Sequence, residues 1–537
     1  MDARAPVELP DASTPPTLAT VETDAGAPAT DLDAGTIVEA GASTPETPGC
    51  VPEAGADEPD DSFVDSNCDG IDGDVASAVF VAPSGNDGAD GTMTSPLRSL
   101  KHAIDVATAA GKSVYLCDGE YAEAVDLESG GVSLYGGYAC DRGWMRERDR
   151  ATVKPKSGVP FTVKNTTAPM VVDRLAFRAV DGTSDGASVV AATVVGAKQV
   201  RFRNALFVAG NATTGASGTP LPDPLWVRQA PAADAVALPD VEDCRTLANV
   251  KSMVFGGPDC LQFSAGAAGA GRLCPNGDSI AGGWGGRGGN WITDFGQYGA
   301  PGADGIPSSG TAHDGAPGVN GDPGAVSTAG FGDIQAGVYV ASNDGKDGSY
   351  GARGQSGRGG DGGDGPVGNG APDWSFWPGG GGGQGGYPGC GGHGGHRGSA
   401  GGASLGLIVV NSVVLLEQST VQTGRGGDGG TGSDGQSGQQ GGPGGKGARA
   451  AAATLPETDG RGSDGGNGGD GGSGGAGGPG GGGPSIAIVW TGTAPSIASV
   501  TYELGTPGYG GTSSGVNGPN GVGGESVSLD QIRSAGQ

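Results

Sequence analysis

Glycine recurs at every third position in four stretches of this 537-residue chain. They run from 345 to 363, 380 to 401, 426 to 447 and 462 to 483, with 7, 8, 8 and 8 consecutive hits. Three residues per turn is the period of a polyproline II helix, whereas a flexible linker has no reason to keep a fixed period. Collagen shares this period but needs long uninterrupted chains rich in proline, and these tracts are only about 20 residues long.

Some of these tracts carry glycine in a second register as well, for example from Gly466 to Gly481. Two of the three faces of such a helix then lack side chains, so helices can pack backbone against backbone. Their N–H and C=O groups would pair between helices, since buried backbone polar groups need partners. We therefore predict bundles of polyglycine II helices, with flexible glycine linkers as the alternative.

Composition limits the size of any ordinary core. The chain has 116 glycines and 36 prolines, while aromatic residues make up 5% and charged residues 17%. Average proteins contain about 7% glycine. A compact core of 537 residues is therefore excluded, and with it the domain count usual for this length.

The net charge of −29 is concentrated near the start of the chain. Residues 1–74 carry 18 Asp or Glu against the single Arg4, a balance of −17. An isoelectric point near 4.3 argues against nucleic acid and against anionic membrane surfaces as partners. The longest apolar run, Leu405 to Leu416, is interrupted by Asn411 and is shorter than the roughly 18 residues of a spanning helix. We expect no transmembrane segment.

Three segments share a pattern of three short strands. They begin at Val189, Ser404 and Ser485, and each is followed by a glycine-rich stretch or end. One such coil cannot bury its apolar face alone, so neighbouring coils must stack. The pattern predicts repeated coils with insertions at one corner.

The segment from Val81 to Tyr138 supports this interpretation. It contains VAPSGND, then DGT, SP and AI, and an amphipathic helix whose apolar face is formed by Leu97, Leu100, Ala103, Ile104 and Ala107. These motifs resemble the start of secreted bacterial right-handed parallel β-helix proteins of the pectate-lyase-like class. The glycine tracts resemble the polyglycine II bundles of Gly-rich adhesins and PGRS-type repeats. The resemblance implies an all-β fold, a right-handed parallel β-helix with polyglycine II insertions.

Seven segments follow from this interpretation. Residues 1–60 form a disordered Ala, Pro, Thr and acidic stalk, which either tethers a domain or serves only as a linker. Residues 61–76 form an Asp-rich turn. The other predicted segments are 77–265 (helix cap and first coils), 266–403 (glycine-rich insertions), 404–423 (a coil), 424–484 (Gly-Gly-X tracts) and 485–537 (terminal coil and glycine-rich tail).

Eight cysteines favour an oxidising compartment. The best pairs by sequence are Cys50 with Cys68 and Cys117 with Cys140, and the pairing of the other four stays open. These are Cys244, Cys260, Cys274 and Cys390. The opening MDARAPVELP lacks the features of a signal peptide, so we expect that a segment upstream was removed or that the start is misassigned.

One acidic motif suggests calcium. DSNCDGIDGD matches the first half of a D-x-[DN]-x-[DN]-G loop, but Ala76 stands where the bidentate Glu is expected. It resembles the C-D-G-x-D metal-binding motif of secreted bacterial proteins. A weak structural Ca²⁺ site and a solvated acidic turn are both open, and no other cofactor is expected. The candidate ligands are Asp65, Asn67, Asp69, Asp72 and Asp74.

Other clusters carry weaker signals. Cys390, His393 and His396 are spaced about 9 Å apart in a polyglycine II helix, too far to share a zinc ion, so they are predicted to form an exposed edge with Tyr387. The aromatic loop could stack on sugars or be buried beneath the glycine bundle. Its residues are Trp374, Phe376 and Trp377. A weak catalytic candidate on the coil surface consists of Asp173, Arg174, Asp181 and Asp185.

These observations predict a non-enzymatic structural or adhesive protein, secreted or on the outer cell surface. Its partner would be an extracellular polysaccharide or a cell-envelope component. A polysaccharide-acting β-helix enzyme is the alternative. Ice binding is disfavoured because the third register around Asp464, Asn467 and Asp470 is charged and mixed rather than uniformly small and weakly polar.

Overall fold

The computed structural model describes residues 50–53, 55–222, 272–282, 314–328, 330–341, 343–359, 383–447, 463–514, 516–521 and 523–528. The described residues from Val51 onward belong to one compact unit. Most of the predicted stalk, residues 1–49, lies outside the described residues. The described residues form three main parallel sheets and very little helix, so the fold is all-β, as the sequence predicts.

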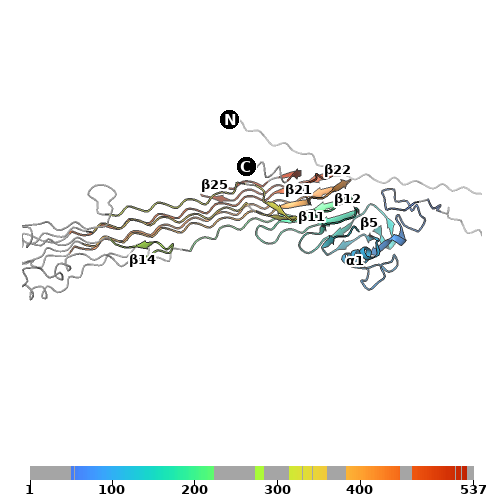
Figure 1. Ribbon diagram of the computed structural model, residues 1–537, viewed down its shortest axis with the longest axis horizontal. Helices are drawn as coiled ribbons and strands as arrows, with labels where there is room; N and C mark the ends of the chain where they lie inside the picture. Colours follow the sequence, from blue (N-terminus) through green and yellow to red (C-terminus); the bar gives the residue numbers. More distant parts are fainter. Residues whose placement is uncertain are drawn as a thin grey trace, which may run out of the picture. The chain divides into compact units, whose positions relative to one another are not determined.

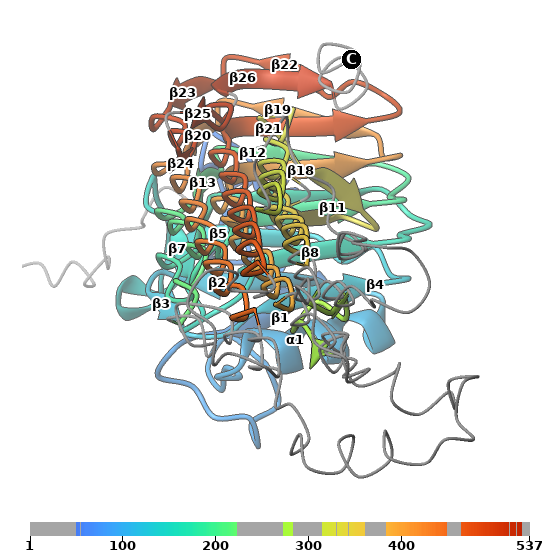
Figure 2. The same ribbon diagram turned by 90° about the vertical axis from the view of Figure 1, so that its left-hand side faces the viewer.

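The strands of the three main sheets stack in chain order (Figure 2). The first sheet contains β1 (Ala78–Val81), β2 (Ser113–Cys117), β5 (Leu134–Ala139), β9 (Met170–Asp173), β12 (Val200–Arg203), β19 (Val414–Glu417) and β22 (Ser496–Ala498), and β6 (Met145–Arg146) pairs antiparallel with β5. The second contains β3 (Glu120–Tyr121), β7 (Ala151–Val153), β10 (Leu175–Arg178), β13 (Leu206–Val208), β20 (Thr420–Gln422) and β23 (Thr501–Glu503). The third contains β4 (Val125–Glu128), β8 (Phe161–Lys164), β11 (Val189–Val195), β18 (Ser404–Val410), β21 (Ser485–Thr491) and β26 (Gly523–Ser528).

From β2 onward the chain visits the first, second and third sheets in turn. Tight corners join the first sheet to the second and the third sheet to the first, and most of these corners contain one residue with a positive φ. Between the first and second sheets these residues are Arg174, Asn204, Gln418 and Ser499, with φ between 48° and 56°. Between the third and first sheets they are Ser129, Asn165, Gly196, Asn411 and Gly492. Asn and Gly tolerate the left-handed conformation best, which explains their recurrence at these corners.

Apolar side chains from all three sheets fill the interior. In β12, Val200 and Phe202 are fully buried, whereas Arg201 and Arg203 alternate outward. In the third sheet, β11, β18 and β21 differ because they are apolar on both faces. Their outer face packs against Phe331, Ile334 and Tyr339, which belong to the hairpin of β16 (Asp333–Gln335) and β17 (Val338–Val340) and to the residues before it. Strands covered on both faces have near-continuous apolar sequences, as in SLGLIVV of β18.

Helix α1 (Leu100–Ala110) packs against the first strands of the stack. The Ser99 hydroxyl accepts a hydrogen bond from the His102 N–H at its start, and Gly111 ends it in the left-handed conformation. The predicted apolar face is confirmed for Leu100, Ala103, Ile104 and Ala107, which are all buried. Leu97 is buried as well, but it lies before the helix and forms a parallel β-bridge with Val81, so its assignment to the helix was wrong. The described residues also include two short 3₁₀ helices, η1 (Val75–Ser77) and η2 (Cys140–Arg142).

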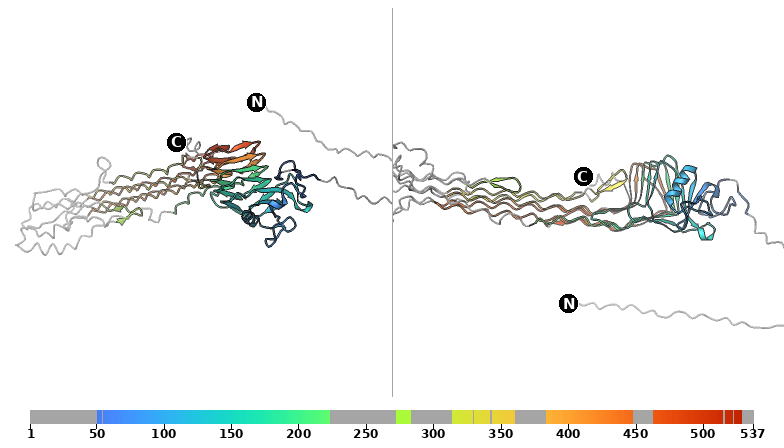
Figure 3. Two further views of the ribbon diagram at one scale, coloured as in Figure 1. Left: turned by 45° about the vertical axis from the view of Figure 1, so that its right-hand side comes forward. Right: turned by 90° about the horizontal axis from the view of Figure 1, so that it is seen from below.

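Every glycine-rich excursion leaves the second sheet and returns to the third. One joins β13 to β18, the next joins β20 to β21, and the last joins β23 to β26. The described tracts run side by side away from the sheets (Figure 1), and the views in Figure 3 agree. These excursions also contain short antiparallel strand pairs: β14 (Arg272–Leu273) with β15 (Ser279–Ile280), and β24 (Thr512–Ser513) with β25 (Val516–Asn517).

Candidate functional site

The glycine tracts are joined by backbone hydrogen bonds at intervals of three residues. The N–H groups of Gly386, Gly389 and Gly392 donate to the carbonyls of Gly466, Gly469 and Gly472, at 2.8–2.9 Å. The same ladder continues in both directions. Tract 463–483 is bonded in this way to five neighbouring tracts: 314–325, 343–359, 383–402, 424–447 and 506–512.

The order of the tracts follows the order of the strands from which they emerge. Tract 424–447 follows β20 and is bonded on either side to residues 212–218, which follow β13, and to residues 506–512, which follow β23. Strands of a sheet lie about 4.7–4.9 Å apart. We infer that the sheets set the spacing and register at which neighbouring tracts begin.

Side chains complete the hydrogen bonding where the bundle meets its surface. Asp470 Oδ1 accepts from the N–H of Gly441 at 2.8 Å, and Asp428 Oδ1 accepts from the N–H of Tyr509 at 2.7 Å. Five further side chains accept a hydrogen bond from a backbone N–H in the same way: Asp314, Asn320, Asp344, Asp347 and Asp464. The Asp and Asn residues between the glycines therefore replace the carbonyls that a further tract would supply.

The acidic segment before β1 lies across the first turns. We call residues 57–63 the strap. The Pro59 carbonyl accepts from Arg203 Nη2 at 2.7 Å, and the Asp60 carbonyl accepts from Arg146 Nη1 at 2.8 Å. Asp61 Oδ1 accepts from Arg174 Nη2 and from Asn204 Nδ2.

Beneath the strap lies a buried ionic network centred on Asp173, whose side chain is fully buried. Its Oδ2 pairs with Arg146 Nη2 and, at 3.0 Å, with Arg203 Nη2. Arg146 also pairs with Asp72 at 3.0 Å. Burial raises the pKa of Asp72, and the charge of Arg146 opposes that rise.

This network accounts for two members of the weak catalytic candidate. Asp173 pairs with Arg146 and Arg203, and Arg174 pairs with Asp61 of the strap. Asp181 Oδ1 accepts from the N–H of Asn211 at 2.7 Å. Asp185 is exposed, and the described contacts do not join it to the other three. The sequence missed the structural role of Arg146, although its alternation with Glu147 and Asp149 is a signal for two opposite faces.

The five candidate calcium ligands divide into two sets. Asp65 and Asn67 accept hydrogen bonds from the N–H of Asp69, and Asp69 itself accepts from the N–H of Val75. Asp72 instead turns toward Arg146, and Asp74 caps η1 by accepting from the N–H of Ala76. Within the described ranges, no group of three or more His, Cys, Asp or Glu side chains is placed to hold a metal ion. Calcium binding by this motif stays a prediction.

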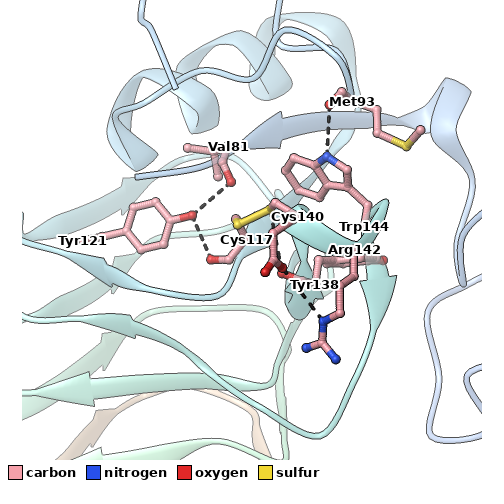
Figure 4. The surroundings of a disulfide bond; sticks show 9 residues. Val81, Met93, Cys117, Tyr121, Tyr138, Cys140, Arg142 and Trp144 are labelled. Carbon is pink, nitrogen blue, oxygen red and sulfur yellow. Dashed lines mark hydrogen bonds and ion pairs between the residues drawn. A yellow bond between two sulfur atoms is a disulfide. The ribbon is translucent and has the colours of Figure 1, made fainter. Parts of the chain in front are cut away.

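Cys117 and Cys140, the pair expected from the sequence, form a disulfide with a Cα–Cα distance of 5.6 Å (Figure 4). Nearby, the Tyr121 hydroxyl donates to the carbonyls of Val81 and Cys117. Cys50 and Cys68 are each disulfide-bonded as well. Cys244 and Cys260 lie outside the described residues.

A second disulfide corrects one expectation from the sequence. Cys390 is bonded to Cys274 and only 5% exposed, and Tyr387 is also buried, so these two residues do not belong to an exposed edge. The guanidinium of Arg272 lies 5.5 Å from the centre of the Tyr387 ring. Residues 272–282 thus cover this part of tract 383–402. Because Cys274 and Cys390 are 116 residues apart, the sequence did not indicate that they pair.

The aromatic loop predicted to contact glycans, with Trp374, Phe376 and Trp377, lies outside the described residues. A shallow hollow of about 420 Å³ occurs where the second sheet passes into the tracts. Its lining includes Asn211, Gln422 and Glu503, and Gln422 Nε2 donates to Glu503 at 2.8 Å. In the part of the chain that the structure describes, no helix is both long and apolar enough to cross a membrane.

Asp118 provides a pH-dependent prediction. Burial, followed by the charges of Asp149 and Glu147, raises its pKa to about 6, and its Oδ1 has no hydrogen-bond partner among the described residues. A carboxyl group with a raised pKa stabilises the fold at low pH and loses that contribution as pH rises from about 4 through 6. We expect Asp118→Asn to gain at most about 2 kcal/mol relative to the wild type between pH 4 and pH 8, because the side chain is only half-buried and solvent screens its neighbours. Urea unfolding at both pH values measures this.

The control for this prediction is Asp126→Asn, because Asp126 is exposed on β4. Its difference from the wild type should change little between the two pH values. An Asp118→Asn difference that is the same at pH 4 and pH 8 would contradict the prediction.

Comparisons of the chain with protein-family models, with curated proteins and with solved structures found no match.

Proposed function

We propose that this chain is a secreted or surface-exposed structural or adhesive protein. In this proposal its stacked sheets form a right-handed parallel β-helix, and its excursions form a polyglycine II bundle. The hydrogen bonding at every third residue carries the proposal, because it fixes each tract against several neighbours. Such a bundle extends outward from the sheets while holding the side chains between the glycines at regular intervals.

The proposed role as an adhesive follows from what this bundle offers at its surface. Polar side chains of neighbouring tracts lie in rows, for example Thr214, Asp428 and Tyr509, whose parent tracts are bonded to one another. Tyr509 is 66% exposed. A regular polar face with exposed aromatic rings suits an extended polymer such as a polysaccharide. The disulfides support an oxidising compartment.

Binding and turnover assays together test this function. We expect the immobilised full-length protein to retain at least one class of extracellular polysaccharide on a glycan array and to leave it intact. Retention of none, or lyase or hydrolase turnover of a retained polymer, would contradict the proposal. Asp181→Ala is the informative variant for the enzymatic alternative, since Asp181 is exposed and lies outside the buried network.

A further inference from the structure

In the segment from Arg146 to Arg150, the arginines and the acidic side chains lie on different sides of the chain. Arg146 enters the buried network, the Arg148 guanidinium lies 5.9 Å from the centre of the Phe63 ring, and Arg150 Nε donates to the Asn204 carbonyl at 2.6 Å. The intervening acids lie elsewhere. Glu147 pairs with Arg142, and Asp149 lies close enough to Asp118 to raise the pKa of that carboxyl. Successive residues of an extended chain point to opposite sides, so the acids are separated from the arginines.

Strand pairing brings further arginines to the same place. β7 pairs in parallel with β10, so that Ala151 is opposite Leu175 and Arg150 lies next to the Arg174 corner. Arg174 shares the Phe63 ring with Arg148, at 4.8 Å from the ring centre, and donates to the Arg148 carbonyl. Burial, followed by the charges of Arg174 and Arg178, lowers the pKa of Arg150. Three guanidinium groups, those of Arg148, Arg150 and Arg174, therefore gather at this corner, and Arg178 lies at the other end of β10.

Few of these charges are neutralised within the protein. Arg174 is paired with Asp61. Among the described residues, however, Arg148, Arg150 and Arg178 form no ion pair. The chain as a whole carries a net charge of −29, so an unpaired cationic cluster stands out from its surroundings. Like charges that repel one another at fixed positions are stabilised when an anion binds between them.

We propose that Arg148, Arg150 and Arg178 bind the sulfate or phosphate ester groups of an acidic polysaccharide. This inference rests on the proposed adhesive function and names the class of polymer and the place where it binds. Guanidinium groups present paired N–H donors that match the oxygens of such esters and stay charged at any physiological pH. The surrounding negative charge favours a polymer with spaced anionic groups over the dense phosphates of nucleic acid.

Three forms of one polymer test this site: unsubstituted dextran, dextran sulfate and dextran phosphate. Titration calorimetry with the full-length protein at 50 mM and 200 mM NaCl compares them. We expect one or both charged forms to bind, with affinity that falls at least about tenfold at the higher salt concentration. The preferred form distinguishes sulfate from phosphate esters. Failure of both charged forms to bind at 50 mM NaCl would overturn the proposal.

Variants locate the binding. The double variant Arg148→Gln with Arg178→Gln should lower the affinity for the charged dextran at least about tenfold. Neither side chain donates a hydrogen bond to another described residue, so the substitutions remove no such bond from the fold. Arg150→Gln should act in the same direction, with melting used to confirm folding because Arg150 also bonds to Asn204. The matched control is Arg425→Gln, an exposed arginine of the bundle paired with Asp428, and it should change the affinity less than about twofold.

The outcomes distinguish failure of the proposed arginine site from failure of the proposed adhesive function. Equal affinity of the wild type and the double variant would place the binding elsewhere and overturn this inference. If a neutral glycan is retained on the array while charged dextrans fail, the site is wrong and the adhesive function stands. If no glycan is retained at all, the proposed function falls first.

Discussion

Gly469→Val or Gly472→Val should lower the free energy of unfolding by more than 2 kcal/mol, or prevent the bundle from forming. A Cβ placed on Gly469 would lie well under 3.0 Å from the carbonyl of Ala316, and one on Gly472 would meet the carbonyl of Val319 in the same way. The tracts would have to separate, which leaves N–H and C=O groups without partners. Each unpaired buried group costs about 1–3 kcal/mol. Thermal unfolding of the full-length protein measures the loss.

Asp470→Asn is the matched control in the same tract. Asp470 is exposed, and its Oδ1 accepts from the N–H of Gly441. Asn keeps that acceptor, so the variant should melt close to the wild type. A valine at position 470 is a weaker control, because it removes the acceptor. Equal melting temperatures for Gly469→Val and Asp470→Asn would refute the packed bundle and favour flexible linkers.

The local patterns of this fold could be predicted from the sequence. The three-residue glycine period matches the spacing of the hydrogen bonds between tracts. The apolar face of α1 could be found from its helical spacing, because a helix buries residues that lie three or four positions apart. Cys117 is the last residue of β2 and Cys140 directly follows β5, its neighbour in the first sheet, so the short sequence separation indicated the correct pair.

The long-range features could not be predicted, since each depends on which turn stacks on which. The sequence predicts that the tracts pack, but it does not indicate that tract 463–483 has five bonded neighbours. The hairpin of β16 and β17 packs against the third sheet, although more than a hundred residues separate it from β11 in the sequence. Asp173 looked like a surface acid because the strap and Arg146, which bury it, come from other segments.

Asp173→Ala should lower the free energy of unfolding by about 3–5 kcal/mol, because it leaves Arg146 and Arg203 buried or half-buried without their shared carboxylate. Glu417→Ala is the control on the same outer row of the first sheet, where Arg203 is opposite Glu417. The Arg201–Glu417 pair is partly exposed, so its loss should cost less than about 1 kcal/mol. Urea unfolding of both variants gives the comparison.

Replacing the network by apolar groups distinguishes buried charge from simple loss of contacts. Asp173→Leu combined with Arg146→Met removes both a buried carboxylate and its main partner, and should recover part of the stability that Asp173→Ala loses. Asp72 would then lose its pairing to Arg146, which sets a limit on the recovery. If Asp173→Ala and Glu417→Ala lower the free energy of unfolding by the same amount, Asp173 is not the centre of a buried network and behaves as an ordinary surface acid. A large loss would also mean that reduced turnover in Asp173→Ala reports unfolding, so that only Asp181→Ala tests catalysis on this surface.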